Sequence, residues 1–284
     1  MQSRIFVLCL ALVVPLQADS PAAMVPLKPV IQAHYDGGFP NDFPDEFSRV
    51  QTLIPLAQLD IATQLGTASY SQGFQHPVRV RFEDGGPALA ENPYFYLQRS
   101  ADGVPFEQTL VVNVEAFAKA SGDSNWKDDA LRHALNYTMT QLIFNDIAGG
   151  DADQALPSWV QEGTAVYLSG MGQAFVEKAA SEVTRSHVGE LVDDLNRPLP
   201  MMNRRQYARD YLAIHYIAHA GGSGTFQALI SDLLKNTSAA AAIQDVLGQD
   251  WNTFEENVKK FSTGAFAQYA REDEDPVTPS HRKS

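Results

Sequence analysis

Cysteine is nearly absent from this sequence. Its 284 residues include one cysteine, Cys9, which lies in the apolar N-terminal run. Leu8 precedes it, where a lipoprotein signal would have a small residue. We therefore expect no lipid anchor, no disulfide and no cysteine-bound metal in the mature chain.

Positive charge is also scarce. Lys and Arg number 21 against 34 Asp and Glu, which gives a formal net charge of −13. Such a balance repels phosphate backbones, so we expect no nucleic-acid partner. The hydrophobic content of 44% over 284 residues is nevertheless enough to build one sizeable core.

Long apolar runs are missing as well. No stretch approaches the ~20 apolar residues of a transmembrane helix. The run 5–14 is shorter and follows Arg4, so residues 1–18 are predicted to be a secretory signal, cleaved at its end or slightly later, after Ala22 or Ala23. We expect a secreted or periplasmic protein without a stable membrane anchor.

The rest of the chain divides into three parts. Residues 19–44 contain several Pro and Gly without periodicity, which predicts an extended lead-in. Residues 45–267 are predicted to form one folded domain. The charged segment 268–284 carries two prolines and is predicted to be a disordered tail.

Within the folded part the patterns predict an α+β domain. Apolar spacing favours a helix over 46–65, which Pro55 would kink or break. Alternation and β-branched residues favour three strands, at 77–82, 94–97 and 108–114. We expect this small mixed sheet to extend to about residue 125 and to be followed by central helices over 126–170 and an all-helical subdomain over 171–267. The helices of that last part are predicted at 175–183, 206–220, 226–234, 239–247 and 252–266.

The first central helix has an unusual composition. It opens at Asp128 and Asp129 and ends at the Gly149-Gly150 pair, and it has no charged side chain between Arg132 and Asp146. Over three to four turns this helix has no charged side chain that could face water. We therefore expect it to be buried. The second central helix begins at Pro157 and carries Glu162.

These two helices carry a motif. The first contains His133-Ala134-Leu135-Asn136-Tyr137, and the second follows from Leu156-Pro157-Ser158-Trp159-Val160-Gln161-Glu162-Gly163-Thr164-Ala165-Val166-Tyr167. This order resembles the peptidase MA-like branch of the gluzincins, thermolysin-type zinc metallopeptidases with H-E-x-x-H on one helix and L-P-x-W-x-x-E-G-x-A-x-Y on the next. The resemblance covers roughly residues 45–266, is most specific over 126–170, and implies a zincin-like fold.

In that family two histidines one turn apart and the glutamate of the next helix bind zinc, and the glutamate after the first histidine is the general base. Here Ala134 stands where the base would be, and Tyr137 stands where the second histidine would be. A methyl group accepts no proton, and a phenol with a pKa near ~10 is a poor zinc ligand. The sequence therefore predicts a degenerate H-E-x-x-H site in which His133 and Glu162 remain and face each other across a cleft.

The function that this pattern favours is binding without catalysis. We expect a pseudo-peptidase whose cleft holds an extended peptide or a segment of an envelope protein, paired with an edge strand of the sheet. No cofactor is expected, although zinc is possible on His133 and Glu162 with a third contact from Asn136, Tyr137 or a water. On a simpler view, His133 is a buried histidine hydrogen-bonded to Glu162.

The alternative is an active metal-dependent peptidase with a rearranged site, in which His215 or His219 joins His133 and Glu162. His215 and His219 are spaced i and i+4, although a cation near a helix C-terminus is a simpler role for the second. Tyr211, and Tyr207 before it, lie where related enzymes place a side chain that stabilises the oxyanion, or else belong to the core. A third possibility is a structural role with the cleft closed.

Overall fold

The structure is a computed structural model that describes residues 44–71, 73–76, 78–83, 92–99, 106–122, 128–150, 155–191, 195, 204–235 and 237–271. The predicted signal segment and nearly all of the lead-in lie outside these ranges. The described elements are α2 (Pro44–Gln64), η1 (Ala68–Ser71), β1 (Val78–Glu83), β2 (Phe95–Arg99), β3 (Gln108–Asn113), α3 (Val114–Gly122), α4 (Asp128–Ile147), α6 (Ser158–Ser169), α7 (Gly172–Ala180), η2 (Arg185–Leu191), α8 (Arg204–Gly221), α9 (Ser223–Leu233), α10 (Ala239–Leu247) and α11 (Trp251–Ala267). The α+β class predicted from the sequence is confirmed.

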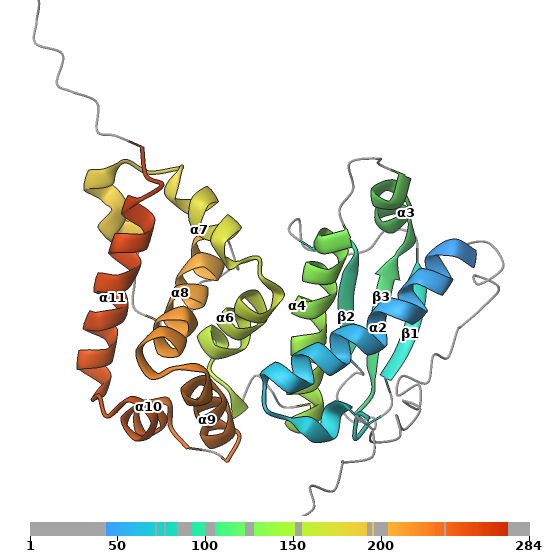
Figure 1. The fold of residues 1–284 in the computed structure, drawn as a ribbon, viewed down its shortest axis with the longest axis horizontal. Helices are drawn as coiled ribbons and strands as arrows, with labels where there is room; N and C mark the ends of the chain where they lie inside the picture. The colour runs from blue at the N-terminus through green and yellow to red at the C-terminus, as the bar shows by residue number, and fades with distance from the viewer. Residues whose placement is uncertain are drawn as a thin grey trace, which may run out of the picture.

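The sheet is small and mixed. Its strand order is β1-β3-β2, with β1 parallel and β2 antiparallel to the central β3. The alternation predicted for β1 is present, because Val78, Val80 and Phe82 are buried while the charged residues between them are half-exposed. Figure 1 shows α2 crossing the sheet and α4 beside β2. Among the described strands, β2 is therefore the edge strand next to α4.

Helix α2 and the end of the third strand differ from the sequence prediction. Helix α2 continues through Pro55 without a break. Pro55 has no N–H to donate to the turn before it, and that turn is exposed at Gln51 and Thr52, so the helix tolerates the proline. The third strand ends at Asn113, and helix α3, which was not predicted, follows at once. The side chain of Asn113 accepts a hydrogen bond from the amide of Ala116 at 3.3 Å, so it caps this helix.

The buried central helix is confirmed. Every residue of α4 from Ala134 to Thr140 is buried. On its different sides α4 contacts α2, strand β2 and α6. Figure 1 shows it standing between the sheet and the helices α6 to α11. A helix enclosed in this way has no need of a charged face, which explains the composition of its sequence.

Helix α6 packs closely against α8. A Cβ atom placed on Gly163 would lie 2.3 Å from the backbone oxygen of Asp210 and 2.8 Å from Cγ1 of Ile214. The two backbones therefore approach at a distance that only glycine allows. Asp210 itself is fully buried and is paired with the guanidinium of Arg209 at 2.8 Å. Burial of its carboxyl raises the pKa of Asp210 to about 6 in spite of that partner.

The folded part of the chain extends beyond residue 267, the C-terminal boundary predicted from the sequence. Residues 268–271, which were predicted to begin a disordered tail, belong to the folded part. The amide of Arg271 donates to the carbonyl of Val183, and Arg271 forms a bridge with Thr184. The rest of the predicted tail lies outside the described residues. In the described part of the chain, no helix combines the length and the apolar character needed to cross a bilayer.

The close approach of α6 and α8 can be tested with Gly163→Ala. The added methyl group meets backbone rather than a movable side chain, so we expect the free energy of unfolding to fall by about 3 kcal/mol. Gly264→Ala in α11 is the matched control, because a Cβ there meets nothing within 4 Å and should stabilise the helix by about 1 kcal/mol. Denaturant unfolding measures both, and equal effects would contradict the packing described.

Candidate functional site

The two motif helices meet through a hydrogen bond between Tyr137 and Glu162. The phenol of Tyr137 donates to Oε2 of Glu162 at 2.6 Å. One turn further along α4, Nε2 of Gln141 lies 3.3 Å from Oε1 of the same carboxylate and 3.1 Å from the phenol oxygen. The glutamate of α6 and the second motif position of α4 are therefore neighbours, as the family pattern requires.

Tyr137 is a neutral donor in this pair. Its side chain is 4% exposed. Burial, the carboxylate of Glu162 and the neighbouring Tyr207 raise the pKa of Tyr137 well above 10. The phenol consequently keeps its proton at any physiological pH, and that proton points to Glu162.

His133 occupies a different position from the one expected. It is half-buried, and its Nε2 lies 3.3 Å from the place that a Cβ would take at Gly170, the C-cap of α6. Because His133 is near the end of α6 while Tyr137 is near Glu162, the two helices run antiparallel. The sequence predicted His133 opposite Glu162, but the hydrogen bond to Glu162 comes from Tyr137 instead.

Ala134, at the position of the family's general base, is a core residue. It is 1% exposed. Its carbonyl accepts hydrogen bonds from Nδ2 of Asn92 at 3.1 Å and from the hydroxyl of Thr138 at 3.0 Å. The methyl group has no proton-accepting function, and the amide of Asn92 attaches the segment before β2 to this part of α4.

A cavity of about 250 Å³ lies between β2, α4 and α6. Its lining includes β2 with Asn92 before it, the α4 side chains at i+4 spacing (Tyr137, Gln141 and Asn145) and Gln161 and Glu162 of α6. Neutral amides and hydroxyls predominate, with Glu162 as the acid and the exposed Arg99 as the base among the described lining residues. The cavity can therefore bind a polar ligand by hydrogen bonds.

Strand β2 presents backbone groups along this cavity. The amide of Asn113 in β3 donates to the carbonyl of Tyr94 at 2.9 Å. In an antiparallel pair, residues that bond to the neighbouring strand alternate with residues that face away from it. The backbone groups of Phe95 and Leu97 therefore face away from β3, and the Phe95 amide accordingly donates to Oδ1 of Asn92 at 3.2 Å.

The tyrosine predicted to stabilise an oxyanion lies elsewhere. Tyr211 stacks on Tyr167 with ring centroids 6.2 Å apart and packs against Gly172, and it does not line the cavity. Burial and neighbouring tyrosines raise its pKa. The tyrosine that reaches Tyr137 is Tyr207, one turn earlier, at 6.4 Å between ring centroids in an edge-on arrangement.

His215 and His219 belong to an aromatic cluster. The ring of His215 lies 5.3 Å from Tyr211 and 5.5 Å from Phe261, and that of His219 lies 6.0 Å from Phe261. Burial, together with the charge of His219, lowers the pKa of His215. Neither histidine lines the cavity that contains Glu162.

A zinc site of the gluzincin type needs three ligand side chains, histidines and a glutamate, close together. Across the described ranges, no three His, Cys, Asp or Glu side chains come together as a metal site would require. The set of His133, Glu162 and either His215 or His219 is therefore not assembled. Oε2 of Glu162 instead accepts a hydrogen bond from the phenol of Tyr137. The side chains present at this position do not fit zinc.

Sequence reasoning missed several lining residues, above all Gln141 and Asn145. The signal was available, because His133, Tyr137, Gln141 and Asn145 follow one another at four-residue spacing and so share a face of α4. Asn92 had no comparable signal. It lies outside any strand or helix pattern and reaches the site only through the tertiary fold.

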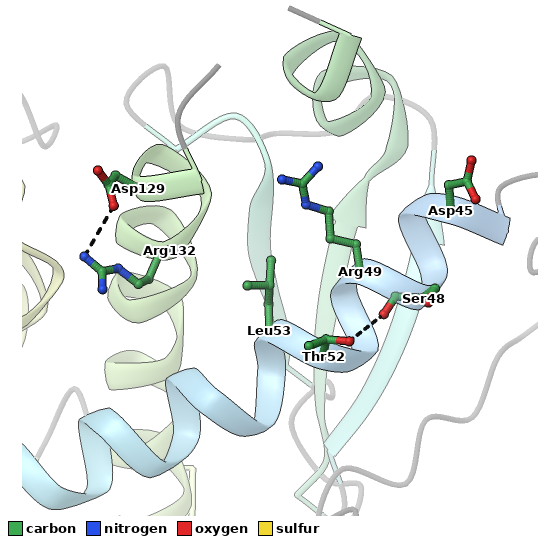
Figure 2. A pocket seen from close by; sticks show the side chains of 7 residues that line it. All are labelled: Asp45, Ser48, Arg49, Thr52, Leu53, Asp129 and Arg132. Carbon is green, nitrogen blue, oxygen red and sulfur yellow. Dashed lines mark hydrogen bonds and ion pairs between the residues drawn. The ribbon is translucent and has the colours of Figure 1, made fainter. Parts of the chain in front are cut away.

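A second hollow, of about 480 Å³, lies between the N-terminal parts of α2 and α4. Figure 2 shows Arg132 joined to Asp129 on α4, while Arg49 and Asp45 project from α2. Two acids and two bases balance one another here, and Arg132 pairs with Asp129 at 3.5 Å. This surface therefore has no charge preference for a ligand, and the cavity beside β2 is the better candidate.

Comparison with known proteins found no matching family model, no similar curated protein and no similar solved structure. The likeness to the gluzincins thus rests on the motif residues and on the contact between α4 and α6, and family membership remains a prediction.

The hydrogen bond between Tyr137 and Glu162 can be tested with Tyr137→Phe. The change leaves a half-buried carboxylate without its best donor, so we expect the free energy of unfolding to fall by about 1–3 kcal/mol. Tyr96→Phe is the matched control, because its phenol also donates to a carboxylate, Glu83, at 2.7 Å but near the surface. Denaturant unfolding should show a smaller loss for the control, and a loss as large as that of Tyr137→Phe would refute the special role of the buried bond.

Proposed function

We propose that this chain is a secreted or periplasmic peptidase MA-like protein with a zincin-like fold, which binds an extended peptide or protein segment and does not hydrolyse it. One observation carries the proposal: Tyr137, at the position of a zinc-binding histidine, donates its proton to Glu162, at the position of the zinc-binding glutamate. The two positions that the motif pairs in the gluzincins are therefore in contact here.

The absence of hydrolysis follows from the chemistry of the residues. A hydrolytic site needs a group that removes a proton from the attacking water, and Ala134 offers only a buried methyl. The carboxylate of Glu162 is near the cavity but is held by Tyr137 and Gln141. The polar lining therefore serves to hold a ligand by hydrogen bonds.

Strand addition is the binding mode that β2 supports. Its outward N–H and C=O groups at Leu97 face away from β3 beside the cavity, and an extended peptide would bond to them as a fourth strand. Backbone hydrogen bonds would supply affinity for any sequence, and the cavity would accept a side chain. The proposal therefore names an extended segment, rather than a helix or a small metabolite, as the ligand class.

The kinship with zinc peptidases can be tested by restoring a ligand with Tyr137→His. In the gluzincin arrangement this imidazole would complete a three-ligand site with Glu162 and with His133, whose ring would have to turn from Gly170 toward Glu162. We expect one zinc per chain and a stabilisation of about 2.7 kcal/mol at a hundredfold excess of zinc over Kd. The same variant carrying Glu162→Gln is the control and should lose the effect. Metal analysis and thermal unfolding measure this, and no zinc-dependent change in the first variant would contradict the kinship.

Strand addition can be tested with backbone-methylated peptides. A peptide selected for binding from a random decapeptide library is resynthesised with N-methyl groups on alternate amides, in the two possible sets. The set whose amides face β2 should lose binding by roughly tenfold or more, since each loses a hydrogen bond and meets the strand edge, while the other set should bind normally. Fluorescence anisotropy measures both, and equal behaviour of the two sets would rule out this mode.

A further inference from the structure

The cavity beside β2 contains a buried polar group without a partner. Asn145 is 1% exposed, lines the cavity, and its Nδ2 has no hydrogen-bond acceptor in the described structure. It follows Gln141 and Tyr137 at four-residue spacing, so its side chain lies on the face of α4 that turns to the cavity. A buried donor of this kind costs stability unless something else satisfies it.

The other side chains that line the cavity limit which chemical group can be the hydrogen-bond partner of Asn145. Asn145 requires an acceptor oxygen in the ligand. The carboxylate of Glu162 accepts from Tyr137 and Gln141, and a carboxylate has capacity for a further donor. A ligand group that offers an oxygen acceptor and an N–H donor together satisfies both sides. At roughly 30 Å³ per water, a cavity of about 250 Å³ accommodates a group of several heavy atoms.

We propose that this cavity is a specificity subsite for a side-chain carboxamide, the Gln or Asn of a bound peptide, with Asn145 donating to its oxygen and Glu162 accepting from its NH₂ group. The inference rests on the proposed peptide-binding function and adds the residue type that the cleft selects. A carboxylate side chain meets the negative charge of Glu162, an ammonium offers no acceptor to Asn145, and an apolar side chain leaves the Asn145 donor unpaired.

The strand geometry agrees with this assignment. Leu97 turns its backbone groups outward beside the cavity, and a peptide bonded there alternates its side chains between the two faces of the extended sheet. A side chain on the α4 side of such a peptide enters the cavity over Gln141 and Asn145. Asn145 is therefore a residue that determines specificity, while β2 provides affinity that is independent of sequence.

The test uses the full mature chain and five pools of fluorescent decapeptides, randomised except for one fixed central residue: Gln, Asn, Glu, Met or Leu. We expect the Gln or the Asn pool to bind roughly ten- to a hundredfold more tightly than the Glu, Met and Leu pools. If no pool binds, the proposed peptide-binding function fails and the subsite fails with it. If all pools bind equally, the subsite alone is overturned.

Asn145→Leu separates a ligand-binding role from a structural one. If Asn145 serves the ligand, the variant binds all pools with the affinity of the Met pool and its thermal unfolding midpoint is unchanged or raised, because an unpaired buried donor has been removed. Gln98→Leu, on the opposite face of β2 where it bonds to Arg81, is the matched control and keeps the carboxamide preference. A sharp fall in the midpoint for Asn145→Leu, or an unchanged preference, would overturn the assignment.

Discussion

The hydrogen bond from Tyr137 to Glu162 is the contact on which the arrangement of the site depends. It joins α4 to α6 at a defined axial position. Gly163, the residue after Glu162, packs against the backbone of α8. Helix α6 is therefore fixed on one side by the hydrogen bond of Glu162 and on another side by close packing. A shift of α6 along its axis would break the first contact and create a clash at the second.

This contact also changes what the carboxylate does. In a three-ligand metal site a glutamate needs a cation to balance its charge, whereas here a neutral phenol stabilises it with a proton that burial keeps in place. The carboxylate thereby accepts a hydrogen bond from a neutral donor within the protein. The unsatisfied hydrogen-bonding capacity lies farther along the same helix face, at Asn145.

Much of the fold was predictable from local patterns, and the exceptions have physical reasons. Helix α3 was missed because β-branched residues continue to Val114, and only the capping bond of Asn113 ends the strand there. Tyr211 and Tyr207 are both aromatic residues of α8 one turn apart, so spacing alone did not distinguish them. The crossing of α8 over α6 turns Tyr207 toward Tyr137 and Tyr211 toward Tyr167.

By itself, the sequence determined that α4 is buried and that His133, Tyr137, Gln141 and Asn145 share one of its faces, because helical periodicity and the lack of charge are local properties. Only the tertiary structure decided that Glu162 meets Tyr137 rather than His133, and that β2 is the edge strand beside the cavity. The axial register of two helices and the order of strands in a sheet depend on contacts between distant segments, which no local pattern encodes.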